Sequence, residues 1–196
     1  MKDFAISGVY TTFFDKLEKV NNFLEAVIDF ADEDLDSRHN QKLLSDPIPD
    51  GGQWDMAVGV LKKYGCVPSW IMPETVHSSG TAQYLPILSR KMREYALELR
   101  KMVAEGVDPS ARKSEMLQEM YNALCILYGK PPKAFDFVYT DKDDVYHEEL
   151  DMTPQRFFEE YVGDDLDDYV CLIAAPDRPV NEMYSQPHLS NLVEVE

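Results

Sequence analysis

Three cysteines carry the side chains best suited to nucleophilic catalysis in this sequence. A cysteine nucleophile must form a thiolate, usually at the beginning of a helix, and it needs a histidine base within reach. Cys66 is instead followed by Val67 and Pro68 in a predicted loop. Cys125 falls on the apolar face of a predicted helix, and Cys171 lies inside an apolar stretch typical of a strand. We therefore expect three inert thiols and assign no catalytic residue.

The four histidines do not follow a metal-binding pattern. Zinc ligands recur at short, fixed spacings along a chain, and no two of these histidines are so placed. They are His39, His77, His147 and His188. The sequence also lacks the glycine-rich phosphate and dinucleotide loops and the G-x-S-x-G motif of serine hydrolases. We expect neither a metal ion nor a cofactor.

Acidic residues cluster at two places that could suggest calcium binding. The first run places three aspartates at the first three ligand positions of an EF-hand loop: Asp32, Asp34 and Asp36. Ser37 stands where that loop turns on a glycine, however, and Leu43 replaces its bidentate glutamate. The stretch 141–143 fails in the same way, because Tyr146 occupies the glycine position. Two pairs of adjacent carboxylates receive no acid–base role, since no polar pocket can be inferred around them: Glu148 and Glu149, and Glu159 and Glu160.

The composition indicates a globular protein with an acidic surface. The 196 residues suffice for one sizeable core, or for one large and one small lobe. The 36 acidic and 19 basic side chains give this chain a formal net charge of −17, which argues against binding to nucleic acid or to an anionic membrane. No apolar run approaches a membrane span, and no secretory signal is visible. Three widely spaced cysteines are typical of free thiols in a reducing compartment.

Helices dominate the first two thirds of the chain. Apolar residues recur at steps of three and four from Val9 to about Phe30, which predicts a long amphipathic helix with Ser7 as its cap. The acidic stretch 32–36 ends this helix or opens a short second one. A helix is predicted over 53–64, with four residues on one face: Trp54, Ala57, Val58 and Leu61. Two longer helices are predicted over 83–105 and 113–128, and their methionine- and leucine-rich stripes indicate core packing.

The pattern changes after residue 130 from a period of 3.6 towards a period of 2. Aromatic residues alternate with polar ones over 135–139, and the polar turn 141–144 follows, which predicts a β-hairpin. A threonine cap followed by proline opens a short helix over 153–163, and residues 169–174 are typical of a buried strand. The sequence therefore predicts an α+β fold that is mostly helical, with a smaller β-containing part.

Three stretches of the chain are more specific together than any single residue. They are YTTFFDKLEK at 10–19 with NFLE at 22–25, DGGQWDM at 50–56 leading to KYG at 63–65, and VP at 67–68 with MPET at 72–75 and two serines at 78–79. Later features fit the same order: an arginine-rich helix over 90–100, the proline pair 131–132, MTP at 152–154, and DYV at 168–170 leading to AP at 175–176. Over nearly its whole length the chain resembles the bleomycin hydrolase / aminopeptidase C family, the cytoplasmic branch of the papain-like cysteine peptidases.

This resemblance implies a fold and an incomplete set of catalytic groups. The expected fold is the central part of a papain-like cysteine peptidase: a helical lobe with the cleft wall over 1–80, a helical insertion over 81–130, and over 131–196 a hairpin, short helix and strand leading into the β lobe. Papain-like enzymes use an oxyanion-hole glutamine, a nucleophilic cysteine, and a histidine and asparagine far downstream. In the family the first pair precedes the segment that resembles this chain and the second pair follows it. We therefore predict that the chain alone is inactive. Gly8 departs from the glutamine that commonly follows the serine there.

The cleft wall is what the resemblance carries over residue by residue. The Gly-Gly pair of papain-like enzymes offers backbone hydrogen bonds to the substrate, and the residues that follow line the pocket for its second side chain. By resemblance, Gly51 and Gly52 would take the first role, and Gln53 and Trp54 would shape the pocket. Glycine suits this role because it lets another backbone approach closely. The alternative is a plain tight turn before a helix, with Trp54 in the core.

Two functions of different classes follow from these observations. The first is a segment of a cytoplasmic cysteine aminopeptidase that releases N-terminal residues from peptides, with a peptide substrate as its partner in the full-length protein. The second is a non-catalytic interaction or assembly module retained as a natural truncation. Full-length members of the family form homohexamers, and we expect this chain to self-associate through surface that the β lobe would otherwise cover.

Overall fold

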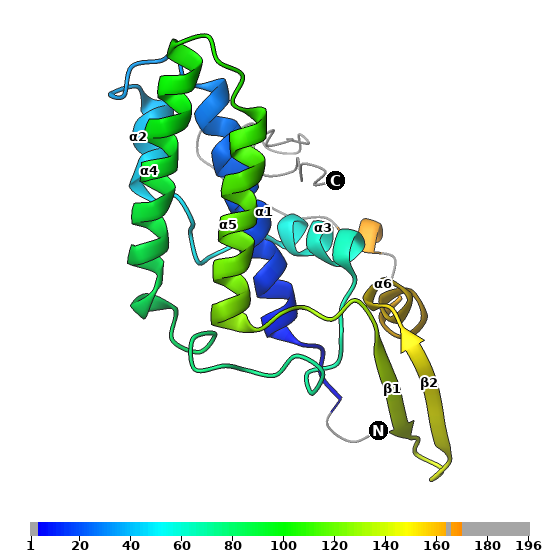
Figure 1. Cartoon of the computed structure of the whole chain (residues 1–196). Helices are drawn as coiled ribbons and strands as arrows, with labels where there is room; N and C mark the ends of the chain where they lie inside the picture. Colours follow the sequence, from blue (N-terminus) through cyan, green and yellow to red (C-terminus); the bar gives the residue numbers. More distant parts are fainter. Residues whose placement is uncertain (1–3, 164–165, 170–196) are drawn as a thin grey trace, which may run out of the picture.

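The computed structural model describes residues 4–163 and 166–169, and in this part of the chain helices predominate over a single hairpin (Figure 1). The long helices are α1 (Gly8–Asp29), α4 (Leu85–Ala104) and α5 (Ser110–Tyr128). The shorter helices α2 (Arg38–Ser45) and α3 (Trp54–Tyr64) lie between α1 and α4 in the sequence. Strands β1 (Phe135–Thr140) and β2 (Tyr146–Met152) are followed by α6 (Pro154–Phe157). Short helical turns cover Thr81–Gln83, Phe158–Val162 and Leu166–Asp168.

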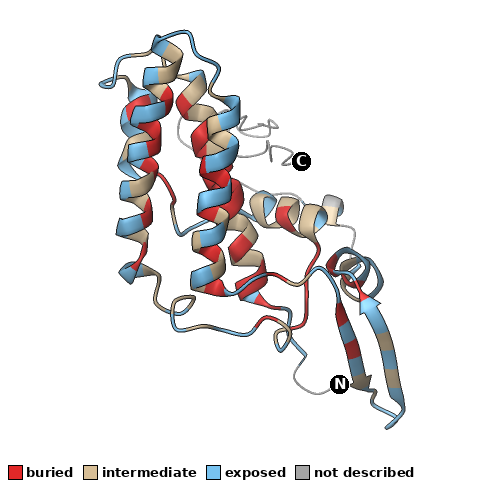
Figure 2. Ribbon diagram, in the orientation of Figure 1, coloured by how far each residue is buried: buried red, intermediate tan, exposed pale blue. Residues whose placement is uncertain are grey.

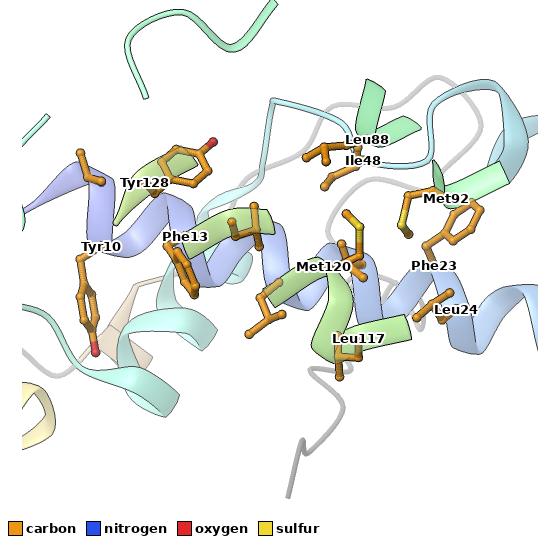
Figure 3. Packing of buried hydrophobic residues seen from close by; sticks show 14 of the residues in the cluster. Tyr10, Phe13, Phe23, Leu24, Ile48, Leu88, Met92, Leu117, Met120 and Tyr128 are labelled. Atoms are coloured by element: carbon orange, nitrogen blue, oxygen red, sulfur yellow. The ribbon is translucent and has the colours of Figure 1, made fainter. Parts of the chain in front are cut away.

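Helices α1, α4 and α5 lie alongside one another and enclose most of the core (Figures 1 and 2). Their buried faces are lined with aromatic, leucine and methionine side chains, as the predicted stripes require. Phe13 of α1 meets the rings of Tyr121 and Tyr128 of α5 edge-on, with centroids 5.4 and 6.4 Å apart. Figure 3 shows this packing at close range, including Met92, Met120 and the neighbouring leucines. The methionine stripes are therefore core.

The ends of the helices follow from local chemistry. Ser7 caps α1, because its Oγ accepts a hydrogen bond from the N–H of Tyr10 at 3.1 Å. The same hydroxyl donates to the carbonyl of Met72 at 2.5 Å, which fastens the beginning of α1 to the loop after α3. Helix α5 begins three residues earlier than predicted, since the carboxylate of Asp108 accepts from the N–H of Ser110 at 3.0 Å.

The acidic stretch 32–36 forms the connection between α1 and α2. Carbonyl groups in this stretch and just before it accept hydrogen bonds from a buried side chain: Asn40 Nδ2 donates to those of Phe30, Glu33 and Asp34 at 3.0–3.3 Å. Arg100 of α4 donates to two of the same carbonyls, at 2.9 and 2.6 Å. This arrangement ties α1, α2 and α4 together. The acidic stretch itself is a turn, since α1 ends before it at Asp29 and α2 begins after it at Arg38.

The hairpin and α6 form the smaller β-containing part at the other end of the molecule (Figure 1). Strands β1 and β2 pair antiparallel, and Phe135 and Phe137 turn inward against Phe157 of α6. Thr153 caps α6 by accepting from the N–H of Arg156 at 3.2 Å, and the helical stretch ends at Gly163, as predicted. The α+β, mostly helical fold predicted from the sequence is thus confirmed.

Helix α3 differs from its prediction in the face that it buries. Val60 is its buried residue, with Leu61 and Tyr64 partly buried beside it, whereas Trp54 is 45% exposed. The apolar face is wide enough for several rotations about the helix axis to fit the sequence, and contact with α1 selects one of them. Trp54 therefore does not belong to the core of the described residues.

Two further predictions are limited by the range of the structure. Of the strand predicted over 169–174, only Tyr169 is described, so that prediction lies outside the described residues. The three-part division at residues 80 and 130 remains a prediction, and one hydrophobic cluster extends over all three parts. In the described ranges, no helix has both the length and the apolar character required to cross a membrane.

Candidate functional site

The four predicted site residues lie in and after the loop that joins α2 to α3. This glycine loop (residues 46–53) is anchored at its beginning by Pro47 and Ile48, which are buried in the core. Gly51, Gly52 and Gln53 are exposed, and Trp54 opens α3. The sequence therefore places the Gly-Gly pair on the surface, immediately before a helix.

Lys16 of α1 reaches the glycine loop from inside the molecule. Its side chain has no exposed surface, and its Nζ donates to the carbonyl of Pro49 and to Asp50 Oδ1, both at 2.8 Å. The second carboxylate oxygen of Asp50 accepts a hydrogen bond from Thr81 Oγ1 at 2.6 Å. A buried ammonium group thus holds the loop from beneath, while a hydroxyl holds the same aspartate from the surface.

Lys19, one helical turn further along α1, makes the second attachment. Its Nζ donates to Asp15 Oδ2 at 2.6 Å, to the carbonyl of Pro49 at 3.1 Å and to the carbonyl of Gly51 at 2.8 Å. An ammonium group has three N–H donors, so these three acceptors use all of them. Only 7% of this side chain is exposed. We call Lys16 and Lys19 together the lysine clamp.

The charges of the clamp respond to burial and to their partners. Burial lowers the pKa of Lys16, and the hydrogen bond to Asp50 opposes that shift. The same hydrogen bond, with that from Thr81, lowers the pKa of Asp50. Each of the two buried lysines has an aspartate oxygen within 2.8 Å of its Nζ.

The main chain of Gly52 is available for another partner. Among the described residues, neither its N–H nor its carbonyl makes a hydrogen bond, whereas the carbonyl of Gly51 is bound to Lys19. A Cβ added at Gly51 would meet nothing within 4 Å, and one added at Gly52 would come only to 3.9 Å from Asp15 Oδ1. Open space therefore lies against both glycines, and neither has a positive φ angle that would require glycine.

Gln53 and Trp54 follow the glycines as an exposed polar side chain and a half-exposed ring. Gln53 is the N-cap residue of α3, but its side chain makes no capping hydrogen bond. The ring of Trp54 lies edge-on to that of Tyr169, with centroids 5.8 Å apart. The structure thus brings all four predicted residues together with one aromatic side chain from late in the chain. Their substrate-binding role stays a prediction.

Among the described residues, Cys66 and Cys125 are wholly or partly buried, and two histidines pair with acidic side chains. Cys66 has no exposed surface, and burial raises the pKa of its thiol to about 12. Cys125 is partly buried on α5, and Cys171 lies outside the described residues. His147 pairs with Asp141 at 2.8 Å in the hairpin, and His39 pairs with Glu33 at 3.1 Å near the end of α1. Within the described residues, no group of three or more histidine, cysteine, aspartate or glutamate side chains could hold a metal ion.

In each of the two pairs of adjacent carboxylates, one member has a partner within the fold. Glu149 accepts hydrogen bonds from Arg156, at 2.7 Å, and from the hydroxyl of Tyr161. Glu160 pairs with the same arginine at 2.7 Å, and Glu148 and Glu159 are exposed. These contacts fasten β2 to the helical stretch after it, which gives the carboxylates a role in the fold.

Comparison with known proteins gives this structure a family. A family model described as the Peptidase C1-like family matches residues 1–196, and the chain belongs to that family. The chain is 47% identical to aminopeptidase C of Listeria innocua over 195 residues and 44% identical to aminopeptidase C of Streptococcus thermophilus over 198 residues. These alignments confirm the resemblance to the bleomycin hydrolase / aminopeptidase C branch.

The solved structure of PepW from Lactobacillus rhamnosis agrees with this assignment. It is similar to the chain with a TM-score of 0.83 and 47% identity over 86% of the chain. The chain corresponds to only part of these proteins, because it spans 44% of each of the two aminopeptidases and 38% of PepW. The fold is therefore that of one portion of a papain-like cysteine peptidase.

Sequence reasoning missed the lysine clamp. The helical period of α1 places Glu18 and Lys19 away from the apolar face, yet both are buried, as are Lys16 and Asn21. Lys16 itself falls on the apolar face, seven residues after Val9 and seven before Phe23, and Asp15 and Lys19 have the i, i+4 spacing of a helical ion pair. Such pairs are usually on the surface, so the signal does not indicate burial.

Proposed function

We propose that this chain forms one wall of the peptide-binding cleft of a cysteine aminopeptidase that releases N-terminal residues from peptides. The observation that carries the proposal is the exposed main chain of Gly52, which makes no hydrogen bond among the described residues and follows the Gly51 carbonyl held by Lys19. An extended peptide could add its backbone there, as a strand adds to the edge of a sheet. Gln53 and Trp54 would then flank a substrate side chain.

Binding of a plain peptide backbone tests this proposal. We would titrate the ¹⁵N-labelled chain with tri-alanine and follow its amide signals by NMR. Saturable shifts should concentrate at residues 51–54, and Gly52→Val should weaken binding at least about tenfold by filling the space beside the backbone. Gly8→Val is the matched control, because a Cβ there also meets nothing within 4 Å and Gly8 lies outside the loop. Shifts elsewhere, or equal binding by Gly52→Val, would contradict the proposal.

We further propose that the catalytic cysteine, histidine and asparagine of the peptidase are not among the residues of this chain. The burial of Cys66 and its raised pKa support this view, since a thiol of that kind is not a thiolate at neutral pH. The purified chain should not hydrolyse an aminoacyl fluorogenic amide. Turnover that is blocked by a thiol alkylator and lost in Cys66→Ala would refute the assignment.

We place the protein in the cytoplasm and expect the chain to self-associate, with a homohexamer as the assembly of the full-length peptidase. The free thiols of Cys66 and Cys125 support a reducing compartment. Phe4 and Trp70 support self-association, because they are 38% and 45% exposed and their rings touch edge-on at 6.0 Å. Sedimentation over a hundredfold concentration range tests this expectation, and a monomer throughout would contradict it.

A further inference from the structure

The lysine clamp holds the glycine loop mainly through main-chain carbonyl groups, and one contact goes to the side chain of Asp50. Lys16 and Lys19 both donate to the carbonyl of Pro49, and Lys19 also donates to that of Gly51. These acceptors lie two residues apart, so the backbone between them is held at both ends. Asp50, within that span, is held by Lys16 and Thr81. The loop therefore has little freedom immediately before Gly52.

We propose that Lys16 and Lys19 are positioning residues that hold the main chain of Gly52 ready to bind a peptide. This inference rests on the proposed function, because it assigns the clamp to the same cleft wall. A peptide that bound to a mobile loop would have to order it, and the conformational entropy lost in doing so would weaken the binding. The carbonyl of Gly51 is already turned to Lys19, so the exposed main chain of Gly52, which makes no hydrogen bond among the described residues, directly follows a fixed carbonyl.

Stability alone does not explain two cations in this place. Burying an ammonium group costs desolvation energy, and a well-packed apolar side chain of similar size often stabilises a protein as well or better. A methionine at position 19 could pack against the loop, but it could not bind Asp15 and two carbonyls. The hydrogen bonds direct the loop backbone, which an apolar contact does not. Loss of the clamp should therefore weaken peptide binding more than it lowers the free energy of unfolding.

The test compares Lys19→Met, Lys19→Arg and wild type in the 196-residue chain, with tri-alanine as the ligand. We expect Lys19→Met to bind on the order of tenfold more weakly, which corresponds to ordering the backbone of about one residue. Its Gly52 amide should show a lower ¹H–¹⁵N heteronuclear NOE, because the loop is less ordered, while the amides of α5 keep their wild-type values. Lys19→Arg keeps a cationic donor and should recover part of the affinity. The exposed Lys133→Met serves as the matched control and should bind like wild type.

The outcomes separate the clamp from the proposed function. If wild type does not bind tri-alanine, the proposed function fails and takes this inference with it. If wild type binds and a folded Lys19→Met binds equally well, the clamp inference alone is overturned. Should Lys19→Met fail to fold, Asp50→Ala replaces it, because Asp50 is half-exposed and belongs to the same clamp. Unchanged affinity in a folded Asp50→Ala would overturn the inference as well.

Discussion

Replacing Gly65 by alanine should destabilise the fold more than the same change at a comparable glycine. Gly65 ends α3 with φ at 71° and ψ at −157°, a conformation almost restricted to glycine, which costs other residues about 1–3 kcal/mol. A Cβ there would also lie 2.2 Å from the carbonyl carbon and oxygen of Pro154. Relieving that overlap must move the beginning of α6 and weaken the hydrogen bond from Cys66 N–H to the Pro154 carbonyl, now 3.1 Å. Overpacking of this kind adds about 1–3 kcal/mol.

Gly129 supplies the control for backbone strain without overlap. It ends α5 with φ at 89° and ψ at 161°, and a Cβ there would meet nothing within 4 Å. Urea unfolding followed by circular dichroism should show Gly129→Ala losing about 1–3 kcal/mol. Gly65→Ala should lose about 1–3 kcal/mol more than that, which is a large share of the stability of a typical domain. Equal losses in the two variants would refute the argument, because overlap with Pro154 would then contribute nothing.

Three other predictions concern single features of the structure. Cys66, buried with its pKa raised to about 12, should resist iodoacetamide at pH 8 in the folded chain and react on unfolding, as mass spectrometry would show; rapid labelling of the native state would contradict this. The pKa of Asp141 is lowered by its hydrogen bond to His147 and by backbone N–H groups, so its contribution to the hairpin is complete above its ordinary value of 3.8 and is lost as the pH falls through the lowered pKa. Amide NMR spectra should show the hairpin turn losing order in that range first, and a turn unchanged down to pH 2 would count against the pairing. Asn40→Ala should cost about 0.5–1.5 kcal/mol in urea unfolding, since it removes a buried donor while Arg100 and backbone N–H groups still bind the three carbonyls, whereas exposed Gln41→Ala in the same helix should cost little.

The regular elements were predictable because they depend on local signals. Caps such as Ser7 and Thr153 and the glycines after α3 and α5 mark helix ends through their own backbone requirements. The switch from a period of 3.6 to a period of 2 located the hairpin, and Phe135 and Phe137 are both buried as that alternation predicts, although the pairing register shifts between them. These signals need no knowledge of what an element packs against.

The surroundings of the candidate site were less predictable, since they depend on contacts between distant segments. Gly51 and Gly52 were identified by family resemblance, and the structure places them on an open surface. The charged residues beneath them gave no such sign: Lys16 lies more than 30 positions from Pro49 and Asp50, which satisfy it. A lysine is rarely buried without a partner, so even a position on the apolar face of α1 does not indicate burial of Lys16 until that partner is known.

Helix α1 holds α3 at both ends, which makes the geometry of the candidate cleft wall a property of α1. At the beginning of α3 the lysine clamp fixes the glycine loop, and at its end Glu18 binds Lys63 at 2.7 Å and the hydroxyl of Tyr64. One turn of α1, residues 16–19, therefore directs the carboxylate of Glu18 to the end of α3 and the ammonium groups of Lys16 and Lys19 to the loop before α3. Each charge has a partner of opposite sign or a carbonyl, so the burial of this turn costs less than its composition suggests. A change in the tilt of α1 would move both ends of α3 together and would leave the relation of Gly52 to α3 intact.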